Sequence, residues 1–273
     1  MGGEKPDTSR QSNGFGEVHT CLTVRLIAVL RPNIRTCRAS DSLSEIQVLN
    51  RDPVFDYLPV EDANGHLIGL LSNYAVSAAS RDGGGETVGD HMDSLSEADL
   101  IGTGTPIVAL ISRIRRKPFL VVSDQEIIGM VAWSDLQKLP VRAALFALVT
   151  GFELTMYETI MRRFENRADW TEYLDKRRLC MAEKEYLDQC KRGSDVDLLL
   201  CTQFCDKRDI LIKSLDFAVG KQKLTRKFRA IEQVRNDVAH SNNYAKTIEQ
   251  AEKLRMTLAD LGELRGVINS LAR

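Results

Sequence analysis

The sequence has little of several patterns that define common protein classes. No proline follows Pro140, no two cysteines are spaced Cys-x-x-Cys, and 273 residues include only four histidines. The segment from Met1 to Glu17 is rich in glycine, serine and charge, without the apolar core of a signal peptide. We find no later apolar run of membrane-spanning length. We therefore expect a cytoplasmic protein that does not contact a membrane.

The six cysteines do not form a recognisable metal site. No histidine lies near them at the spacing of metal ligands. Cys201 and Cys205 are one helical turn apart and could hold a metal or oxidise, but no second pair completes a site. We expect reduced packing residues and no bound metal. The cysteines are Cys21, Cys37, Cys180, Cys190, Cys201 and Cys205.

Charge is distributed unevenly along a chain of ordinary globular composition, which is long enough for two domains. The net charge of −1 combines −5 in residues 1–140 (13 basic, 18 acidic) with +4 in residues 141–273 (24 basic, 20 acidic). Residues 221–240 alone carry six basic and two acidic side chains. This stretch is either a surface that faces phosphate groups or an ordinary solvated helix face.

An internal repeat organises the first half of the chain. Each copy has an apolar run, a polar turn, and a second apolar run with an early glycine, which predicts a β-hairpin followed by a helix. The first hairpin is expected over 55–72 and the second over 118–135. A helix should precede each, beginning near Asp41 in the first copy and in the second at Thr105 as N-cap with Pro106 as the first helical residue. Residues 81–85 predict a flexible linker.

This repeat resembles a tandem pair of CBS domains, a Bateman module, over residues 20–139. The resemblance rests on the stretch FDYLPVEDANGHLIGLLS in the first copy and on GMVAWSD in the second, which is similar to the family's nucleotide-binding signature. It implies a pseudo-symmetric pair that binds an adenine nucleotide, such as AMP, ATP or a related adenosine compound. Residues 1–19 are expected to be a flexible N-terminus.

The resemblance implies one good nucleotide site, in the second copy. Asp135 would accept hydrogen bonds from the ribose hydroxyls, with Ser134 beside it and Thr103 lining the same cleft. The sequence departs from the pattern at Ala132, where a hydroxyl residue is usual, and at Ala75, which replaces the acidic residue of the first copy. Asp135 could also simply cap the following helix. The basic residues that would meet phosphate are Arg113, Arg115, Arg116 and Lys117.

The second half predicts helices only, because it has no proline and no alternating β-type runs. Helices are expected over 141–167, 171–192, 195–214, 221–240 and 245–271 and should pack as a bundle. The predicted fold class is therefore α+β: a tandem CBS pair over 20–139 followed by an all-α bundle over 141–273.

The helix over 221–240 ends in Arg235, Asn236 and His240, the last being the only histidine of the second half. On a helical wheel of about 100° per residue, its apolar residues form one stripe, while Asn236 and His240 lie on the other side. A buried packing role for His240 is therefore not expected. An ordinary surface histidine, or an imidazole favoured by the helix dipole, remain alternatives.

An Arg-Asn-x-x-x-His run at the end of such a helix resembles the HEPN superfamily, many of whose members are metal-independent ribonucleases. The resemblance covers residues 141–273 and implies a homodimer in which two motifs line one cleft. His240 would exchange protons with an RNA 2′-hydroxyl or leaving 5′-oxygen, Arg235 would stabilise the charged transition state, and Asn236 would orient His240. Glu153 or Glu158 could add a polar contact. The expected RNA phosphate contacts are Arg226, Lys227 and Arg229.

These inferences predict an adenine-nucleotide-regulated, metal-independent endoribonuclease that resembles bacterial stress or defence effectors. One alternative is a non-catalytic nucleotide sensor whose helices bind a protein partner. Another is a HEPN-like toxin that is controlled by a separate antitoxin. The sequence does not distinguish the adenosine ligands, the direction of regulation or the RNA target.

Overall fold

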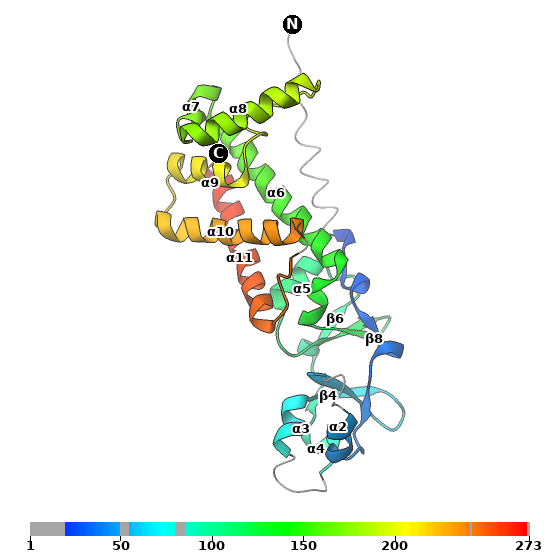
Figure 1. Cartoon of the computed structure of the whole chain (residues 1–273). Coiled ribbons are helices and arrows are strands. Elements are labelled where there is room, and N and C mark those ends of the chain that lie inside the picture. The colour runs from blue at the N-terminus through cyan, green and yellow to red at the C-terminus, as the bar shows by residue number, and fades with distance from the viewer. Residues whose placement is uncertain (1–19, 50–54, 80–85, 241, 272–273) are drawn as a thin grey trace. The chain divides into compact units, whose positions relative to one another are not determined.

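A computed structural model of the chain describes residues 20–49, 55–79, 86–240 and 242–271 (Figure 1). The chain divides into two compact units. The first, here called the helical unit, contains residues 20–22, residues 106–114 and the chain from Leu136 onward. The second, the sheet unit, contains Thr23–Thr105 and Arg115–Asp135. The flexible segments predicted over 1–19 and 81–85 lie outside the described residues.

The sheet unit contains two four-stranded sheets with one topology, which confirms the internal repeat. In each, a short strand pairs parallel with the first strand of a hairpin, whose second strand pairs antiparallel with a strand from the other copy. The first sheet has the order β2 (Cys37–Arg38), β3 (Tyr57–Glu61), β4 (Leu67–Ser72) and β5 (Asp93–Ser94). The second has the order β6 (Leu100–Gly102), β7 (Phe119–Ser123), β8 (Glu126–Val131) and β1 (Val29–Leu30).

The outer strands are thus exchanged between the copies, and two glycines make room for them. A Cβ atom on Gly129 would lie 2.6 Å from the carbonyl oxygen of Val29 in β1. A Cβ atom on Gly69 would lie 2.7 Å from the Sδ of Met92 and 2.9 Å from the carbonyl oxygen of Asp93 in β5. Only glycine allows this approach, which explains why both second hairpin strands carry it at the same place.

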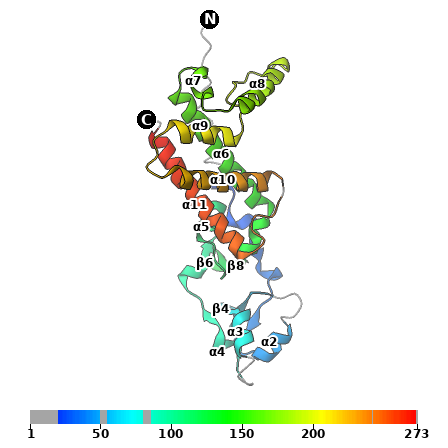
Figure 2. The same ribbon diagram turned by 60° about the vertical axis from the view of Figure 1, so that its left-hand side comes forward.

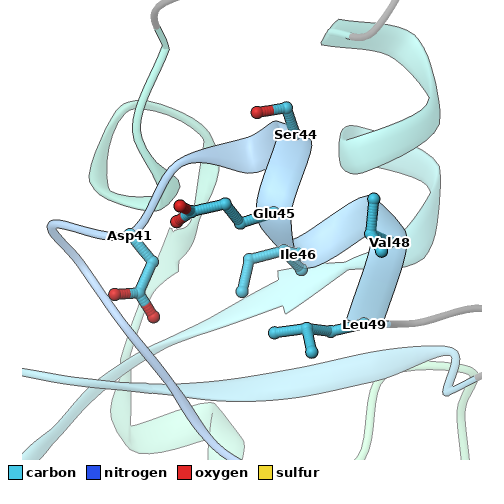
Figure 3. Close-up of a pocket in the computed structure, with 6 residues that line it drawn as sticks. All are labelled: Asp41, Ser44, Glu45, Ile46, Val48 and Leu49. Atoms are coloured by element: carbon cyan, nitrogen blue, oxygen red, sulfur yellow. The ribbon is translucent and has the colours of Figure 1, made fainter.

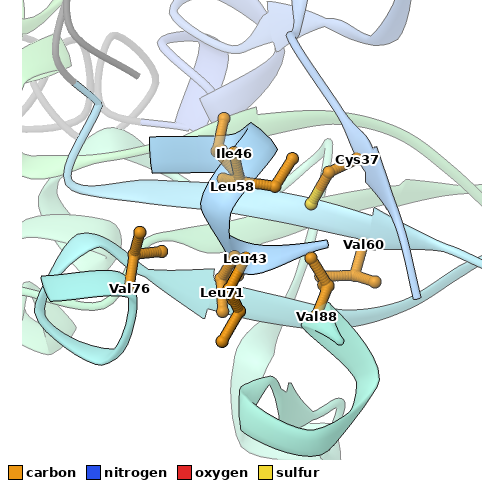
Figure 4. Close-up of a cluster of buried hydrophobic side chains, with 8 residues drawn as sticks. All are labelled: Cys37, Leu43, Ile46, Leu58, Val60, Leu71, Val76 and Val88. Carbon is orange, nitrogen blue, oxygen red and sulfur yellow. The ribbon is translucent and has the colours of Figure 1, made fainter. Parts of the chain in front are cut away.

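A small apolar core holds the first copy together (Figure 4). Leu43 and Ile46 of α2 (Leu43–Leu49) pack over hairpin residues such as Leu58 and Leu71. The copy is completed by α3 (Asn73–Ala79) and α4 (Val88–His91). The described residues also form short 3₁₀ helices: η1 (Val24–Leu26), η2 (Arg31–Asn33), η3 (Glu97–Asp99) and η4 (Trp133–Gln137).

After Lys138, helices are the only regular secondary structure among the described residues, so the predicted α/β region followed by an all-helical region is confirmed. The long α6 contacts α5, α9, α10 and α11, and α10 crosses both α6 and α11 (Figures 1 and 2). The helices of this unit are α5 (Ile107–Arg113), α6 (Leu139–Arg163), α7 (Arg167–Thr171), α8 (Lys176–Lys191), α9 (Phe204–Ser214), α10 (Lys221–Ala239) and α11 (Ile248–Leu271).

Several predicted boundaries are wrong, for identifiable reasons. The helix expected from 171 begins only at Lys176, because Asp175 accepts the Arg178 backbone N–H as an N-cap. The helix expected from 195 begins at Phe204, after a capping box between Gln203 and Asp206. Contrary to the prediction from the sequence, Thr105 is not the N-cap residue of α5. Pro106 holds that position, no side chain caps the helix, and the Ile107 N–H donates to the carbonyl oxygen of Leu22.

Three phenylalanines form the centre of the helical unit. Phe152 of α6, Phe204 of α9 and Phe228 of α10 are fully buried, with ring centroids 5.9 to 6.5 Å apart. By length and mean hydropathy (1.4), α6 could also span a membrane, so the expectation that no run reaches that length is wrong. Ten residues of α6 are nevertheless buried in the described structure, as in the core helix of a globular unit.

Candidate functional site

The end of α10 presents the predicted motif on its solvent side. Five apolar residues of this helix are buried, which confirms the predicted stripe: Leu224, Phe228, Ile231, Val234 and Val238. Arg235 and His240 are exposed, and Asn236 is half-buried. His240 is the C-cap residue of α10.

Arg235 is held by groups on two sides. Its Nε lies 3.8 Å from Oε2 of Glu153 in α6, and its Nη1 donates to Oδ1 of Asn236 over 3.4 Å. Glu153 is itself fixed by the buried Lys207, whose Nζ lies 3.1 Å from Oε1. The structure therefore selects Glu153, and not Glu158, as the acidic neighbour of the motif.

The structure brings together Arg235 and Asn236, but their relation to His240 differs from the expectation. Among the described residues, the His240 ring has no hydrogen bond, and the Asn236 amide oxygen accepts from Arg235 instead. The His240 backbone N–H donates to the Asn236 carbonyl at 2.9 Å, as in an ordinary helix end. The imidazole is thus open to solvent and to a ligand.

Arg142 of α6 fixes this helix end, and sequence reasoning missed it. Its guanidinium donates to the carbonyl oxygens of Asp237, Val238 and Asn242 at 3.0 to 3.1 Å. It also lies over the Tyr244 ring, 5.1 Å from the centroid. These bonds satisfy carbonyls that have no partner within the helix. Arg142 is therefore a positioning residue for the segment that carries His240.

The predicted RNA-facing cations of α10 divide into two kinds. Lys227 makes ion pairs with Asp260 (2.9 Å) and Glu263 (2.5 Å) of α11, and its side chain is only 12% exposed. Hydrogen bonds to Glu263 and Asp260 raise the pKa of Lys227. Arg226 and Arg229 are exposed. Lys227 thus fastens α10 to α11, and the two arginines remain available for an anion.

The predicted nucleotide residues are distributed over both units. Thr103, Ser134, Asp135 and Arg116 belong to the sheet unit, whereas Arg113 ends α5 in the helical unit. Asp135 is buried in η4, and its Oδ2 accepts the Ala132 backbone N–H at 2.7 Å. This bond lies at the start of η4, whereas the helix that follows, α6, has Lys138 as its N-cap residue and no side-chain cap. The suggestion that Asp135 caps the following helix is therefore wrong.

Arg115 and Lys117 are engaged by a buried acid, Asp99. Oδ1 of Asp99 lies 2.6 Å from Nη2 of Arg115, and Oδ2 lies 3.1 Å from Nζ of Lys117. Burial would raise the pKa of Asp99, but hydrogen bonds from Lys117, Ser96 and Arg115 outweigh it and hold the pKa below its usual range. These two cations therefore stabilise the sheet unit.

This arrangement predicts a pH dependence of stability. Because the folded pKa of Asp99 lies below the unfolded value of about 3.9, its stabilisation is complete above that pH and is lost as the pH falls through the folded value. Asp99→Asn should lower the free energy of unfolding at pH 7 by about 1.5 to 3 kcal/mol. In urea titrations from pH 7 to 3.5, the difference from wild type should narrow below about pH 4. Glu97→Gln, which alters an exposed neighbour, should show no such trend, and a pH-independent difference for Asp99→Asn would contradict the assignment.

A surface pocket in the first copy lies beside α2 (Figure 3). Asp41 and Glu45 place their carboxylates on one side, while Val48 and Leu49 lie on the other. Two carboxylates make this pocket unfavourable for a phosphate group. It therefore adds no support for a nucleotide in the first copy, in agreement with Ala75 at the acidic position. The described residues contain no group of three or more histidine, cysteine or acidic side chains placed to hold a metal.

Comparison with known proteins finds similarity among solved structures. No protein-family model matches the sequence, and no curated protein matches it. A CBS-pair protein from Arabidopsis thaliana, CBSX2, is 24% identical, with 45% of this chain and 94% of that chain covered and a TM-score of 0.37. Its complex with AMP is 26% identical over 45% and 96%, with a TM-score of 0.37. The CBS domain of a bacterial CNNM/CorC family Mg²⁺ transporter in complex with ATP is 16% identical over 50% and 97%, with a TM-score of 0.40.

Proposed function

We propose that this chain is a metal-independent endoribonuclease of the HEPN type that acts as a homodimer and is regulated by an adenine nucleotide. The observation that carries the proposal is the outward-facing group of Arg235, Asn236 and His240 at the end of α10. A helix that only packs against its neighbours does not need a cation, an amide and an imidazole gathered at one solvated end. The same groups suit metal-free cleavage of RNA.

In the proposed reaction, His240 takes the proton from a ribose 2′-hydroxyl, whose oxygen then attacks the adjacent phosphorus. The bond from phosphorus to the 5′-oxygen breaks, and a second imidazole across the dimer or the same one returns a proton to that oxygen. The products are a 2′,3′-cyclic phosphate and a 5′-hydroxyl. Arg235, anchored by Glu153, stabilises the negative charge on the phosphoryl oxygens.

The regulatory part of the proposal rests on the sequence resemblance in the second copy and on Asp135. Asp135 is buried, and its Oδ2 accepts the Ala132 backbone N–H, which fixes the carboxylate in the segment that the nucleotide would contact. Asp135 lies four residues before α6 begins at Leu139. A ligand that favours one arrangement of this segment would bias the helix that carries Arg142 and Glu153.

Nucleotide binding can be tested at Asp135 separately from catalysis. AMP and ATP, the ligands in two of the similar solved structures, should each be added to the purified protein while the melting temperature is measured. We expect stabilisation of the wild type, and a decrease in affinity of about 10-fold to 100-fold in Asp135→Ala, the usual effect of removing hydrogen bonds to a charged group. Glu126→Gln, which alters an exposed acid at the start of β8, is the control. Equal stabilisation of all three proteins would contradict the assignment.

The second candidate function is a nucleotide sensor that lacks catalysis and binds a protein through its helices. It is favoured by the absence of any hydrogen bond to the His240 ring among the described residues, since a catalytic imidazole is commonly oriented by a partner. RNA incubated with the wild-type protein in EDTA, with and without each nucleotide, separates the two. Cleavage that depends on His240 supports the enzyme, and intact RNA in every sample supports the sensor.

A further inference from the structure

The helical unit has a cationic groove between α10 and α11, beside the proposed cleavage motif and separate from it. Its volume is about 490 Å³. Three basic side chains line it: Arg226 and Arg229 of α10, and Lys253 of α11. None of the three side chains makes a hydrogen bond or an ion pair with the described residues. Elsewhere on the same helices a cation is paired, as Lys227 is with Asp260 and Glu263.

The one acidic residue of the groove, Asp237, offsets only one of these three positive charges. Oδ1 of Asp237 accepts from Nε2 of Gln233 at 2.9 Å and from Nδ2 of Asn242 at 3.3 Å. The groove therefore contains three basic side chains, none of which makes an ion pair with the described residues, and one carboxylate that is hydrogen-bonded to two amides. Like charges one turn apart lower the stability of a helix slightly, so Arg226 and Arg229 do not serve the stability of α10. Binding of an anionic ligand explains their presence.

The rest of the lining indicates the class of that anion. Ala230, Val234 and Leu254 give the groove an apolar part against which a sugar or base can pack. The Asn243 amide and the amide nitrogen of Gln250, whose oxygen accepts the Lys246 backbone N–H, offer hydrogen-bonding groups that suit hydroxyls and base edges. A simple inorganic anion would use only the cations. A nucleotide strand would use all three kinds of group.

We propose that this groove binds the phosphodiester backbone of single-stranded RNA. This deepens the proposed function and rests on it, because the groove runs along the helix that ends in the Arg235 and His240 motif. Compared with the RNA contacts predicted from the sequence, the proposed RNA surface includes Lys253 of α11 and does not include Lys227. The groove holds the strand through backbone charge and therefore with little dependence on sequence.

The test uses binding without cleavage. A fluorescent single-stranded oligonucleotide with 2′-O-methyl sugars, which has no 2′-hydroxyl nucleophile, is titrated with full-length protein, and its anisotropy is followed at several salt concentrations. The triple variant Arg226→Gln, Arg229→Gln, Lys253→Gln should bind at least tenfold more weakly. Its dependence of log affinity on log salt should be shallower by about 0.7 for each phosphate that the variant no longer neutralises. Arg255→Gln removes one positive charge from α11 outside the groove and should change affinity less than twofold; the single variant Lys253→Gln, which also removes one charge from α11, should weaken binding more.

Three comparisons make the outcome decisive. The triple variant should keep or slightly raise the melting temperature of the wild type, which shows that weaker binding is not unfolding. Inorganic phosphate serves as a competitor: displacement of the oligonucleotide by phosphate at equal concentration would show a site for small phosphates and overturn the RNA assignment. Unchanged oligonucleotide binding by the triple variant would also overturn it.

The result is separable from the proposed cleavage. If RNA is never cut but oligonucleotide binding requires the three cations, the groove stands and the ribonuclease proposal fails. If cleavage requires His240 while the triple variant binds normally, the ribonuclease stands and the groove assignment is overturned.

Discussion

Replacing His240 with alanine should lower the rate of RNA cleavage by about 100-fold to 10,000-fold, the usual contribution of a general acid–base residue. The ring is exposed at the end of α10 and makes no hydrogen bond with the described residues, so its removal should leave the fold unchanged. The rate is measured on a mixed RNA in EDTA, and the products are examined for 2′,3′-cyclic phosphate ends. Circular dichroism and the melting temperature should match those of the wild type.

The matched control is His66→Ala, which removes an exposed imidazole from the turn of the first hairpin. Its ring is 76% exposed and pairs with Asp62. Cleavage should continue at the wild-type rate. If His240→Ala retains more than a third of the wild-type rate, the motif does not act as proposed. The activity would then come from another site or from a contaminating nuclease.

Replacing Phe228 with alanine should lower the free energy of unfolding by about 3 to 5 kcal/mol. The ring is completely buried and lies against Phe152 and Phe204, so its removal deletes apolar contacts with two other helices and leaves a cavity. Urea unfolding followed by circular dichroism measures the change. A decrease of this size would reduce the ordered population of α10 and, with it, any activity of the motif.

Two further variants serve as controls for Phe228→Ala. Phe228→Leu keeps the site apolar and should cost about 1.5 kcal/mol or less if the core can adjust. Met256→Ala removes an apolar side chain that is 62% exposed and should change stability by about 0.5 kcal/mol at most. A decrease below about 1 kcal/mol for Phe228→Ala would mean that the three rings do not form a common core.

Local patterns in the sequence predict much of this structure. The two hairpins, their glycines and the apolar stripe of α10 follow from alternation and helical periodicity, which act between near neighbours. Boundaries set by distant groups are not predictable in this way. Residues 195–203 contain no glycine or proline that would stop a helix, but they form turns, in which the Tyr157 hydroxyl of α6 donates to Asp197 and the Thr202 carbonyl accepts from Lys207. Tertiary contacts override propensity there.

The candidate site, too, can be predicted from the sequence only in part. The charge run and the motif spacing indicate Arg226, Arg229, Arg235 and His240 because all four lie on one helix. Lys253 and Arg142 cannot be found from the sequence, because their roles depend on which helices α10 packs against. Arg142 reaches carbonyls 95 to 100 positions later in the chain. No local signal marks such a contact in a single sequence.

The exchange of outer strands has a consequence for how the chain is made. During synthesis from the N-terminus, β1 leaves the ribosome about a hundred residues before β8, its only sheet partner among the described strands. The first hairpin likewise pairs with β5, which belongs to the beginning of the second copy and is synthesised later. Neither copy is a complete folding unit, since each sheet closes only with a strand from the other. A chain cut between β4 and β5 would therefore yield two pieces with open sheet edges, prone to pair with each other or with further copies.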